Sequence, residues 1–287
     1  MSEYNPITGF KIYQVGHCSH PGCVAERGCG LAPKAFPAYV ALIRHAQFGY
    51  VLFDTGYDPE FFQQTRCFPE SLYARTTPVT LPVPLIEQLA ADGLQETDIQ
   101  HLVVSHFHAD HIAGLKRFRT ATFVADKQGY HKLMRMGRWR QVMKGFIKGL
   151  LPADFESRTA FVRDYPVKLQ DILGIKTYGD LWGCPLFKDG TTYLVNLPGH
   201  AAGHIGLLFR MSGKWVLLCG DAYWTQGNLK RTGLPSRLSH LIMDNARQFH
   251  ETLEYLGRLQ HYHSDVVRVM ASHDDSIATG NPSLEFV

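Results

Sequence analysis

Four side chains that can bind metal lie within six residues of the chain, in the run His106-Phe-His-Ala-Asp-His111. Before them, residues 100–105 are mostly apolar and predict a buried strand, and residues 112–118 predict the start of a helix. A strand that ends in a polar tip and turns into a helix holds its side chains on a rigid backbone. A histidine-rich loop that only meets solvent is the plainer interpretation, but four potential ligands at this spacing favour a metal site.

The spacing within this run suggests two ions. In an extended segment, residues two apart point to the same side, so His106 and His108 can hold one ion together. Asp110 and His111 lie past the turn and can face a second ion beside the first. Imidazole nitrogens suit zinc and iron, and a carboxylate can be shared between two ions.

Three later stretches also place a polar side chain where an apolar strand ends. They contain His200 after a strand and two turn residues, Asp221 after the apolar run 215–219, and His273 after the last predicted strand. A carboxylate at the end of such a run, if buried, must be paired or bound to metal. His204 opens the next strand and is more typical of a buried histidine held by hydrogen bonds.

The pattern His-x-His-x-Asp-His after an apolar strand resembles the signature of the metallo-β-lactamase superfamily of metallohydrolases. The resemblance implies that His200 is a ligand, that Asp221 bridges two ions and that His273 completes the second site. The implied first site is His106, His108, His200 and Asp221, and the implied second site is Asp110, His111, His273 and Asp221. The expected cofactors are two divalent ions, zinc first, with iron, manganese and cobalt as alternatives.

The tripeptide Asp54-Thr-Gly56 ends another predicted strand. Asp and Gly favour a turn, which is the simplest interpretation. In the superfamily, however, a similar Asp-x-Gly lies beneath the metal loop. The resemblance therefore implies that Asp54 orients the ligands and does not bind metal itself.

Within the superfamily, the chain most resembles the N-acyl-homoserine lactone lactonases, the quorum-quenching branch. The matching features are the overall length, Asp54-Thr-Gly56, and the runs 105–111, 198–204, 221–224 and 272–274. The resemblance implies a dinuclear hydrolase that opens a lactone or similar ester by attack of a hydroxide bridging the two ions. Asp110 would accept the proton and return it to the leaving alkoxide.

One departure concerns the group that hydrogen-bonds the substrate carbonyl. The lactonases carry a tyrosine three residues after the bridging Asp, where this chain has Trp224, and the tyrosine here is Tyr223. Trp donates one N–H but cannot titrate, so either Tyr223 takes the catalytic role or the substrate class differs. An apolar acyl chain is expected to lie against Phe107, Phe146 and Leu150.

Other activities share the motif. A thioesterase of the glyoxalase II type usually has a helical C-terminal region with basic residues, whereas only about fourteen residues follow His273. For a mononuclear iron dioxygenase acting on persulfides, metal content and oxygen uptake would discriminate. A nuclease would need a nucleic-acid surface, which a net charge of +3 does not favour. Loss of ligands would point to a non-catalytic binding protein, yet all seven are present.

Length and composition suit an ordinary globular protein of 287 residues, 45% hydrophobic and 19% charged. No linker stands out, so we expect one domain over residues 1–287, an α/β (α+β) chain that the resemblance makes a four-layer αββα sandwich. No 18-residue apolar run and no signal-peptide features are present, which predicts a cytoplasmic protein without a membrane partner. The expected partner is a small ester or lactone, not nucleic acid, and homodimerisation is left open.

Strands are predicted at 10–15, 38–44, 50–53, 121–125, 192–197, 204–210, 215–219 and 266–270, and helices at 82–92, 126–148 and 239–260. Residues 17–37 are rich in Cys, Gly and Pro and predict a long irregular loop. Cys18, Cys23 and Cys29 within it are expected to be free thiols, with a structural zinc site as the alternative. Segment 145–190 is either a second layer of core or an insertion that forms the substrate pocket.

Overall fold

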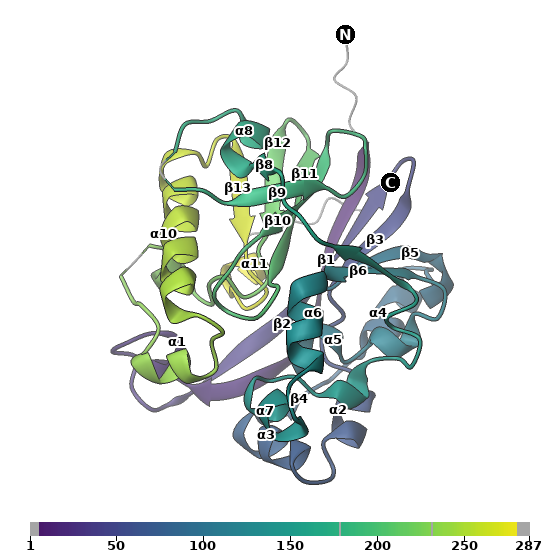
Figure 1. Cartoon of the computed structure of the whole chain (residues 1–287), viewed down its shortest axis with the longest axis vertical. Helices are drawn as coiled ribbons and strands as arrows, with labels where there is room; N and C mark the ends of the chain where they lie inside the picture. The colour runs from purple at the N-terminus through teal and green to yellow at the C-terminus, as the bar shows by residue number, and fades with distance from the viewer. Residues whose placement is uncertain (1–5, 178, 231, 280–287) are drawn as a thin grey trace.

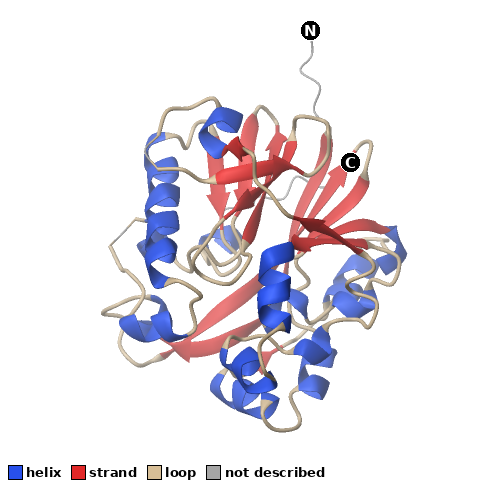
Figure 2. Ribbon diagram, in the orientation of Figure 1, coloured by secondary structure: helices blue, strands red, loops and turns tan. Residues whose placement is uncertain are grey.

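Two β-sheets face each other, and helices cover their outer faces (Figures 1 and 2). This computed structural model describes residues 6–177, 179–230 and 232–279. The strand order is β4-β1-β2-β3-β5-β6-β7 in the first sheet and β13-β12-β11-β10-β9-β8 in the second. These layers are the αββα sandwich that the sequence predicts.

The first sheet combines a long antiparallel hairpin with a parallel half. Its strands are β1 (Ile7–Pro21), β2 (Pro33–His45), β3 (Gly49–Phe53), β4 (Val79–Thr80), β5 (Ile99–Val103), β6 (Thr122–Asp126) and β7 (Thr159–Val162). β3, β5, β6 and β7 run parallel to one another. Parallel strands are covered on both faces, which agrees with the burial of Ile99, Leu102 and Val103 in β5. Their carboxyl ends share one edge of the sheet.

The second sheet is mostly antiparallel. Its strands are β8 (Val167–Lys168), β9 (Trp182–Pro185), β10 (Thr192–Asn196), β11 (Ile205–Met211), β12 (Lys214–Leu218) and β13 (Val267–Met270). β13 pairs with β12 in parallel, so these two strands end on the same side. Phe10 of the first sheet and Phe209 of the second pack with ring centroids 5.3 Å apart, within the apolar layer between the sheets.

The helices are short except for one. They are α1 (Gly22–Ala25), α2 (Pro59–Gln64), α3 (Glu70–Thr76), α4 (Leu85–Ala91), α5 (Ala109–Ile112), α6 (Lys127–Met134), α7 (Arg138–Met143), α8 (Leu169–Leu173), α9 (Gln226–Leu229), α10 (Ala246–Tyr262) and α11 (Ser276–Thr279). α10 lies beside β13 and buries Phe249, Leu253 and Leu256 along one stripe (Figure 1). It begins later than the predicted 239–260 because Asn245 caps it by accepting from the backbone N–H of Gln248.

Two expectations about irregular segments are corrected. The loop predicted at 17–37 is much shorter, because residues 17–21 belong to β1 and residues 33–37 to β2. The helix predicted at 126–148 is two helices, α6 and α7. Segment 145–190 supplies β7 to the first sheet and β8 and β9 to the second, so it is part of the framework.

The cysteines and the helices bear on two further expectations. All six cysteines are free thiols, as expected. Within the described residues, the two clusters that can hold a metal include none of Cys18, Cys23 and Cys29, so the structural zinc alternative has no geometric support. None of the described helices has the length and apolarity needed to cross a membrane.

Candidate metal centre

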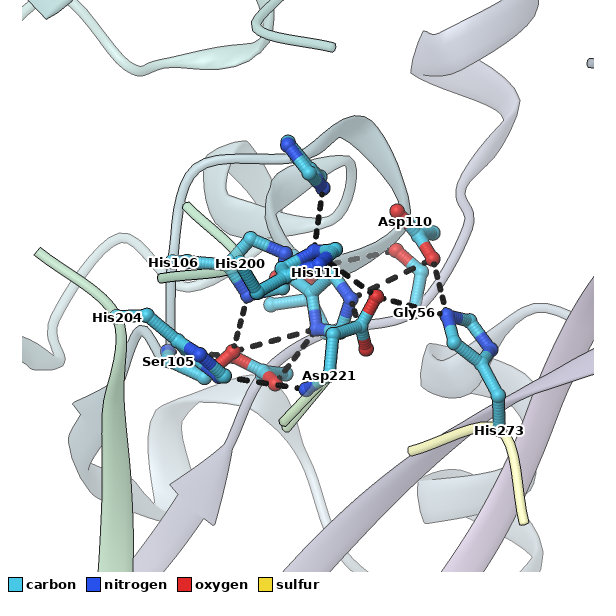
Figure 3. Close-up of polar contacts among 12 residues, drawn as sticks. Gly56, Ser105, His106, Asp110, His111, His200, His204, Asp221 and His273 are labelled. Carbon is cyan, nitrogen blue, oxygen red and sulfur yellow. Dashed lines mark hydrogen bonds and ion pairs between the residues drawn. The ribbon is translucent and has the colours of Figure 1, made fainter. Parts of the chain in front are cut away.

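Seven histidine and aspartate side chains converge where strands of both sheets end (Figure 3). The loop after β5 supplies His106 and His108, and the short helix α5 that follows it supplies Asp110 and His111. The second sheet supplies His200, Asp221 and His273 after β10, β12 and β13, respectively. Each of the predicted ligands is therefore brought to one place.

The seven residues form two clusters that share one carboxylate. The clusters are His106, His108, His200 and Asp221, and Asp110, His111, Asp221 and His273, with one ligand atom of each residue within 4.8 Å of the others. The oxygens of Asp221 lie 3.2 Å from His111 Nε2, 3.3 Å from His200 Nε2 and 3.1 Å from His273 Nε2. Asp221 is thus the residue that joins the two clusters, as the bridging assignment requires.

Unpartnered atoms in the clusters show that the residues fit bound cations. His106 Nε2 is buried and has no hydrogen-bond partner within the described residues. His111 Nε2 and Asp221 Oδ1 are also buried without a hydrogen bond, although they lie 3.2 Å from each other as an ion pair. An unsatisfied buried polar atom costs about 1–3 kcal/mol, so a folded protein rarely keeps several together without a ligand. The donors are imidazole and carboxylate only, which is the set that divalent zinc accepts.

In three of these histidines, Nδ1 contacts a polar group outside the two clusters. Ser105 Oγ lies 3.0 Å from His106 Nδ1, Asp54 Oδ2 lies 2.7 Å from His111 Nδ1, and the carbonyl oxygen of Pro37 lies 2.6 Å from His273 Nδ1. Such contacts fix the tautomer and the orientation of a metal-binding imidazole. Asp54 contacts a ligand from behind, in agreement with its predicted role.

The backbone of Asp54 is unusual, since its φ is 65°. Residues other than glycine rarely adopt this left-handed conformation. Two hydrogen bonds hold the residue there: its N–H donates to the carbonyl of Val103, and its Oδ1 accepts from the N–H of Ser105 at 2.7 Å. The strained turn thus connects β3 to the beginning of the metal loop.

The ionisation of the buried groups favours cation binding at His108 and Asp221 and opposes it at His111. Burial lowers the pKa of His108 to about 3, and the neighbouring imidazole of His200 adds to the effect. Burial would also lower the pKa of His111, but the carboxylates around it, Asp110 first, raise it well above the ordinary value. Burial opposes the charge on Asp221, yet the imidazoles of His273 and His111 hold its pKa well below the usual range. A neutral imidazole and charged carboxylates are the forms that bind metal.

Two further residues shape the centre without belonging to the clusters. His204 is buried, and its Nε2 accepts the backbone N–H of Asp221 at 3.3 Å, so it is the hydrogen-bonded histidine that was expected. Gly145 approaches His108 so closely that a Cβ there would lie 2.8 Å from the imidazole Cδ2. Close approach of this backbone leaves no room for a side chain at position 145.

A cavity of about 120 Å³ opens beside the clusters. Asp110, Asp221 and His273 are among the cluster residues that line it, and its other walls include Phe36, Trp224 and further apolar side chains. Among the described residues that line it, none is a lysine or an arginine. The opening can therefore admit a neutral, largely apolar molecule to the clusters, without a cation to pair with an anionic one.

Most of the residues predicted to contact substrate do not line this cavity. Tyr223 is fully buried, and its hydroxyl donates to Asp274 Oδ2 at 3.0 Å and to the carbonyl of Val269 at 3.3 Å, away from the cavity. Phe107, Phe146 and Leu150 are also buried in the core, where apolar packing accounts for them, and none lines this cavity. Trp224 does line it.

Much of the cavity wall comes from residues that the sequence analysis did not assign to the substrate. Cys18, His20 and Phe36 line it from the β1–β2 hairpin, and Tyr57 and Tyr73 line it from the segment after β3. One sequence feature pointed to Tyr57, which directly follows Asp54-Thr-Gly56. The sequence analysis did not predict this part of the hairpin, because its Cys, Gly and Pro content predicts a loop.

Comparisons with known proteins agree with this geometry. The family model described as the metallo-beta-lactamase superfamily matches residues 33–260. An N-acyl homoserine lactonase, AttM, from Rhizobium radiobacter is 26% identical over 198 residues, which are 68% of this chain and 63% of that protein. A probable metallo-hydrolase from Mycobacterium tuberculosis is 26% identical over 203 residues, 67% of this chain and 59% of that protein.

The chain thus spans somewhat less than two thirds of the length of these curated relatives. Among solved structures, an N-acyl homoserine lactone hydrolase with its product N-hexanoyl-L-homoserine at the catalytic metal centre has a similar fold. It superposes with a TM-score of 0.71 at 14% identity, over 98% of this chain and 99% of that one. At that identity the likeness concerns the fold alone.

Proposed function

Because the chain belongs to the metallo-beta-lactamase superfamily, we propose that it is a metal-dependent hydrolase that opens a lactone or a similar neutral ester. The proposal names N-acyl homoserine lactones as the first substrates to try, since both a curated relative and a solved structure of like fold act on them. The observation that carries it is the pair of clusters joined by Asp221 at the end of an apolar cavity.

The residues divide the chemical work among them. Two divalent ions held by the clusters would lower the pKa of a water molecule between them and polarise the substrate carbonyl. The pKa of Asp110 lies below its ordinary range, because His111 and His273 outweigh the cost of its burial. Asp110 is therefore charged at neutral pH, and it can accept the proton of the attacking water and return it to the leaving alkoxide.

The walls of the cavity favour a neutral substrate. A thioester of glutathione and a nucleic acid are both anionic, and sites for such molecules place lysine or arginine near the charge. The described lining offers Phe36, Trp224 and other apolar groups instead. This disfavours the thioesterase alternative and suits an acyl chain. Homodimerisation and a cytoplasmic location stay predictions.

A substrate panel on metal-loaded protein tests the proposal. We expect the protein to bind two ions and to hydrolyse an N-acyl homoserine lactone faster than an aryl ester, a glutathione thioester or a β-lactam. Oxygen uptake with a persulfide should be absent. His106→Ala, which removes one ligand, is the negative control. Intact thioester turnover with no activity on any lactone would contradict the proposed substrate class.

A further inference from the structure

The segment that follows β3 forms one wall of the cavity. It contains α2 and α3 and presents two phenol side chains, Tyr57 and Tyr73, to the space in which Asp110 and Asp221 also lie. The sequence shows only that this segment is rich in aromatic residues and proline. Its position beside the clusters gives those aromatic residues a possible part in substrate binding.

Tyr57 is held rigidly. Its backbone N–H donates to the carbonyl of Val15 at 3.2 Å, and its ring packs edge-on against Phe61 with centroids 5.4 Å apart. Only 1% of the residue is exposed. A side chain fixed in this way can present its hydroxyl without reorganisation when a substrate binds.

The hydroxyl of Tyr57 is buried and has no hydrogen-bond partner within the described residues. It shares this condition with His106 Nε2, an atom of the first cluster for which the proposed ion would account. A phenol is not among the usual ligands of zinc, so the ions leave this atom unexplained. The thiol of Cys18 lies near it but is only a weak acceptor.

We propose that the Tyr57 hydroxyl donates a hydrogen bond to the carbonyl oxygen of the substrate as negative charge builds on it. This is the part that the sequence led us to assign to Tyr223, whose hydroxyl is committed to Asp274 and Val269. The inference rests on the proposed ester hydrolysis. Burial, with Asp110 next in effect, raises the pKa of Tyr57 well above its ordinary value, so the phenol keeps its proton at neutral pH.

Three Tyr→Phe variants, each lacking one hydroxyl, test the inference. Tyr57→Phe removes the proposed donor, Tyr73→Phe removes the other phenol of the cavity, and Tyr255→Phe is the matched control. The Tyr255 hydroxyl is also buried without a partner among the described residues, but it lies outside the cavity. Each variant is measured for metal content, melting temperature, kcat and KM on a homoserine lactone, and calorimetric affinity for the ring-opened N-acyl homoserine.

We expect Tyr57→Phe to keep both ions and to melt no lower than the wild type, because the lost hydroxyl has no hydrogen-bond partner among the described residues beyond the weakly accepting thiol of Cys18. Removing one oxyanion donor costs about 10²–10³ in kcat in well-studied hydrolases. Since the ions would share the charge here, we expect a loss of about 10- to 100-fold in kcat, with KM changed less than about threefold. Affinity for the ring-opened product should fall about tenfold. Tyr255→Phe should match the wild type.

The outcomes separate this inference from the proposed function. Wild-type kcat and product affinity in Tyr57→Phe would contradict the inference alone. A larger loss of kcat in Tyr73→Phe than in Tyr57→Phe would also contradict the inference. So would a loss of bound metal and a lower melting temperature in Tyr57→Phe, because these would show that the hydroxyl has only a structural role. A metal-loaded wild type that turns over no lactone or ester contradicts the proposed function, and the inference falls with it.

Discussion

Asp221 is the side chain on which both clusters depend, because its two oxygens approach histidines of each. We expect Asp221→Asn to bind fewer than two ions and to lose more than about 100-fold in kcat/KM, since even residues that only support ligands cost 10- to 100-fold. Metal analysis and steady-state kinetics measure the two effects, and circular dichroism checks the fold. Full activity in this variant would rule out the dinuclear centre.

Replacing Asp54 tests whether its contact with His111 Nδ1 contributes to metal binding. Asp54→Asn keeps the volume but weakens the hold on His111 Nδ1, so we expect a loss of about 10- to 100-fold in metal affinity or activity. Asp189→Asn is the matched control, because Asp189 Oδ2 lies 2.9 Å from His45 Nε2 in a similar buried pair that takes no part in either cluster. Equal losses of metal affinity in both variants would show that the effect is general destabilisation.

Metal binding should release protons. The carboxylates around His111 raise its pKa well above the ordinary value, so the metal-free protein carries a proton there at neutral pH that an ion must displace. Zinc affinity should therefore rise with pH until His111 loses that proton unaided. Zinc titrations at pH 7 in two buffers of different ionisation enthalpy measure the release. Equal apparent enthalpies in both buffers would contradict the prediction.

The raised pKa of His111 also affects the stability of the metal-free protein, and this effect depends on pH in the opposite direction to zinc affinity. A histidine whose folded pKa is raised contributes stability that is fully present below its unfolded pKa, about 6.5. That contribution disappears as the pH rises through the raised folded pKa. The His111 contribution should thus fade at alkaline pH, where zinc binding becomes strongest.

At this scale the sequence predicts which residues gather in the two clusters better than which residues line the cavity. His106, Asp221 and the other ligands follow apolar strands, and their residue types limit what they can do in a buried place. The substrate contacts depend on side-chain direction. Tyr223 and Trp224 are neighbours, yet one points into the core and the other into the cavity, and spacing cannot decide which.

Among the elements, the end of α7 is the one most closely tied to the centre. Gly145 has a φ of +69° just after the helix, a left-handed conformation that ends many helices, and its backbone packs against His108. An added Cβ would meet that imidazole. We therefore expect Gly145→Ala to weaken metal binding by more than about tenfold, beyond a backbone strain of about 1–2 kcal/mol.

Gly213→Ala is the control for that strain. Gly213 has a φ of +80° in the turn between β11 and β12, and a Cβ there would meet nothing within 4 Å. It should lose about 1–2 kcal/mol of unfolding free energy and keep its metal. Equal metal affinity in the two variants would show that the contact between position 145 and His108 is unimportant.

A strand or helix could be predicted from the sequence where one physical rule decides its position. The strand predicted at 100–105 from its apolar residues 102–104 is found as β5, close to its predicted bounds. β1 and β2 extend beyond their predicted bounds because pairing with each other supplies hydrogen bonds that the run of Cys, His and Pro does not suggest. β8 has only two residues, too few for any periodicity to show.

At the scale of the molecule, the centre ties one sheet to the other. Two divalent ions would link the loop after β5 to the ends of β10, β12 and β13, so removing them should destabilise the whole fold. Zinc at 100 times its Kd adds about 2.7 kcal/mol per ion. At about 2–4 °C per kcal/mol, a chelator should lower Tm by about 5–10 °C for each ion removed. Asp221→Asn should show a smaller shift, and an unchanged wild-type Tm would contradict the prediction.

The place of β13 in the chain has a consequence for how the protein is made. His273 follows β13, whereas every ligand of the cluster of His106, His108, His200 and Asp221 comes earlier in the chain. All four residues of that cluster therefore emerge from the ribosome before β13, the strand that pairs in parallel with β12. In the proposed dinuclear centre, one ion can enter the nascent chain before the other has a full set of ligands. The metal most available during translation would then occupy the first cluster, whatever the finished protein prefers.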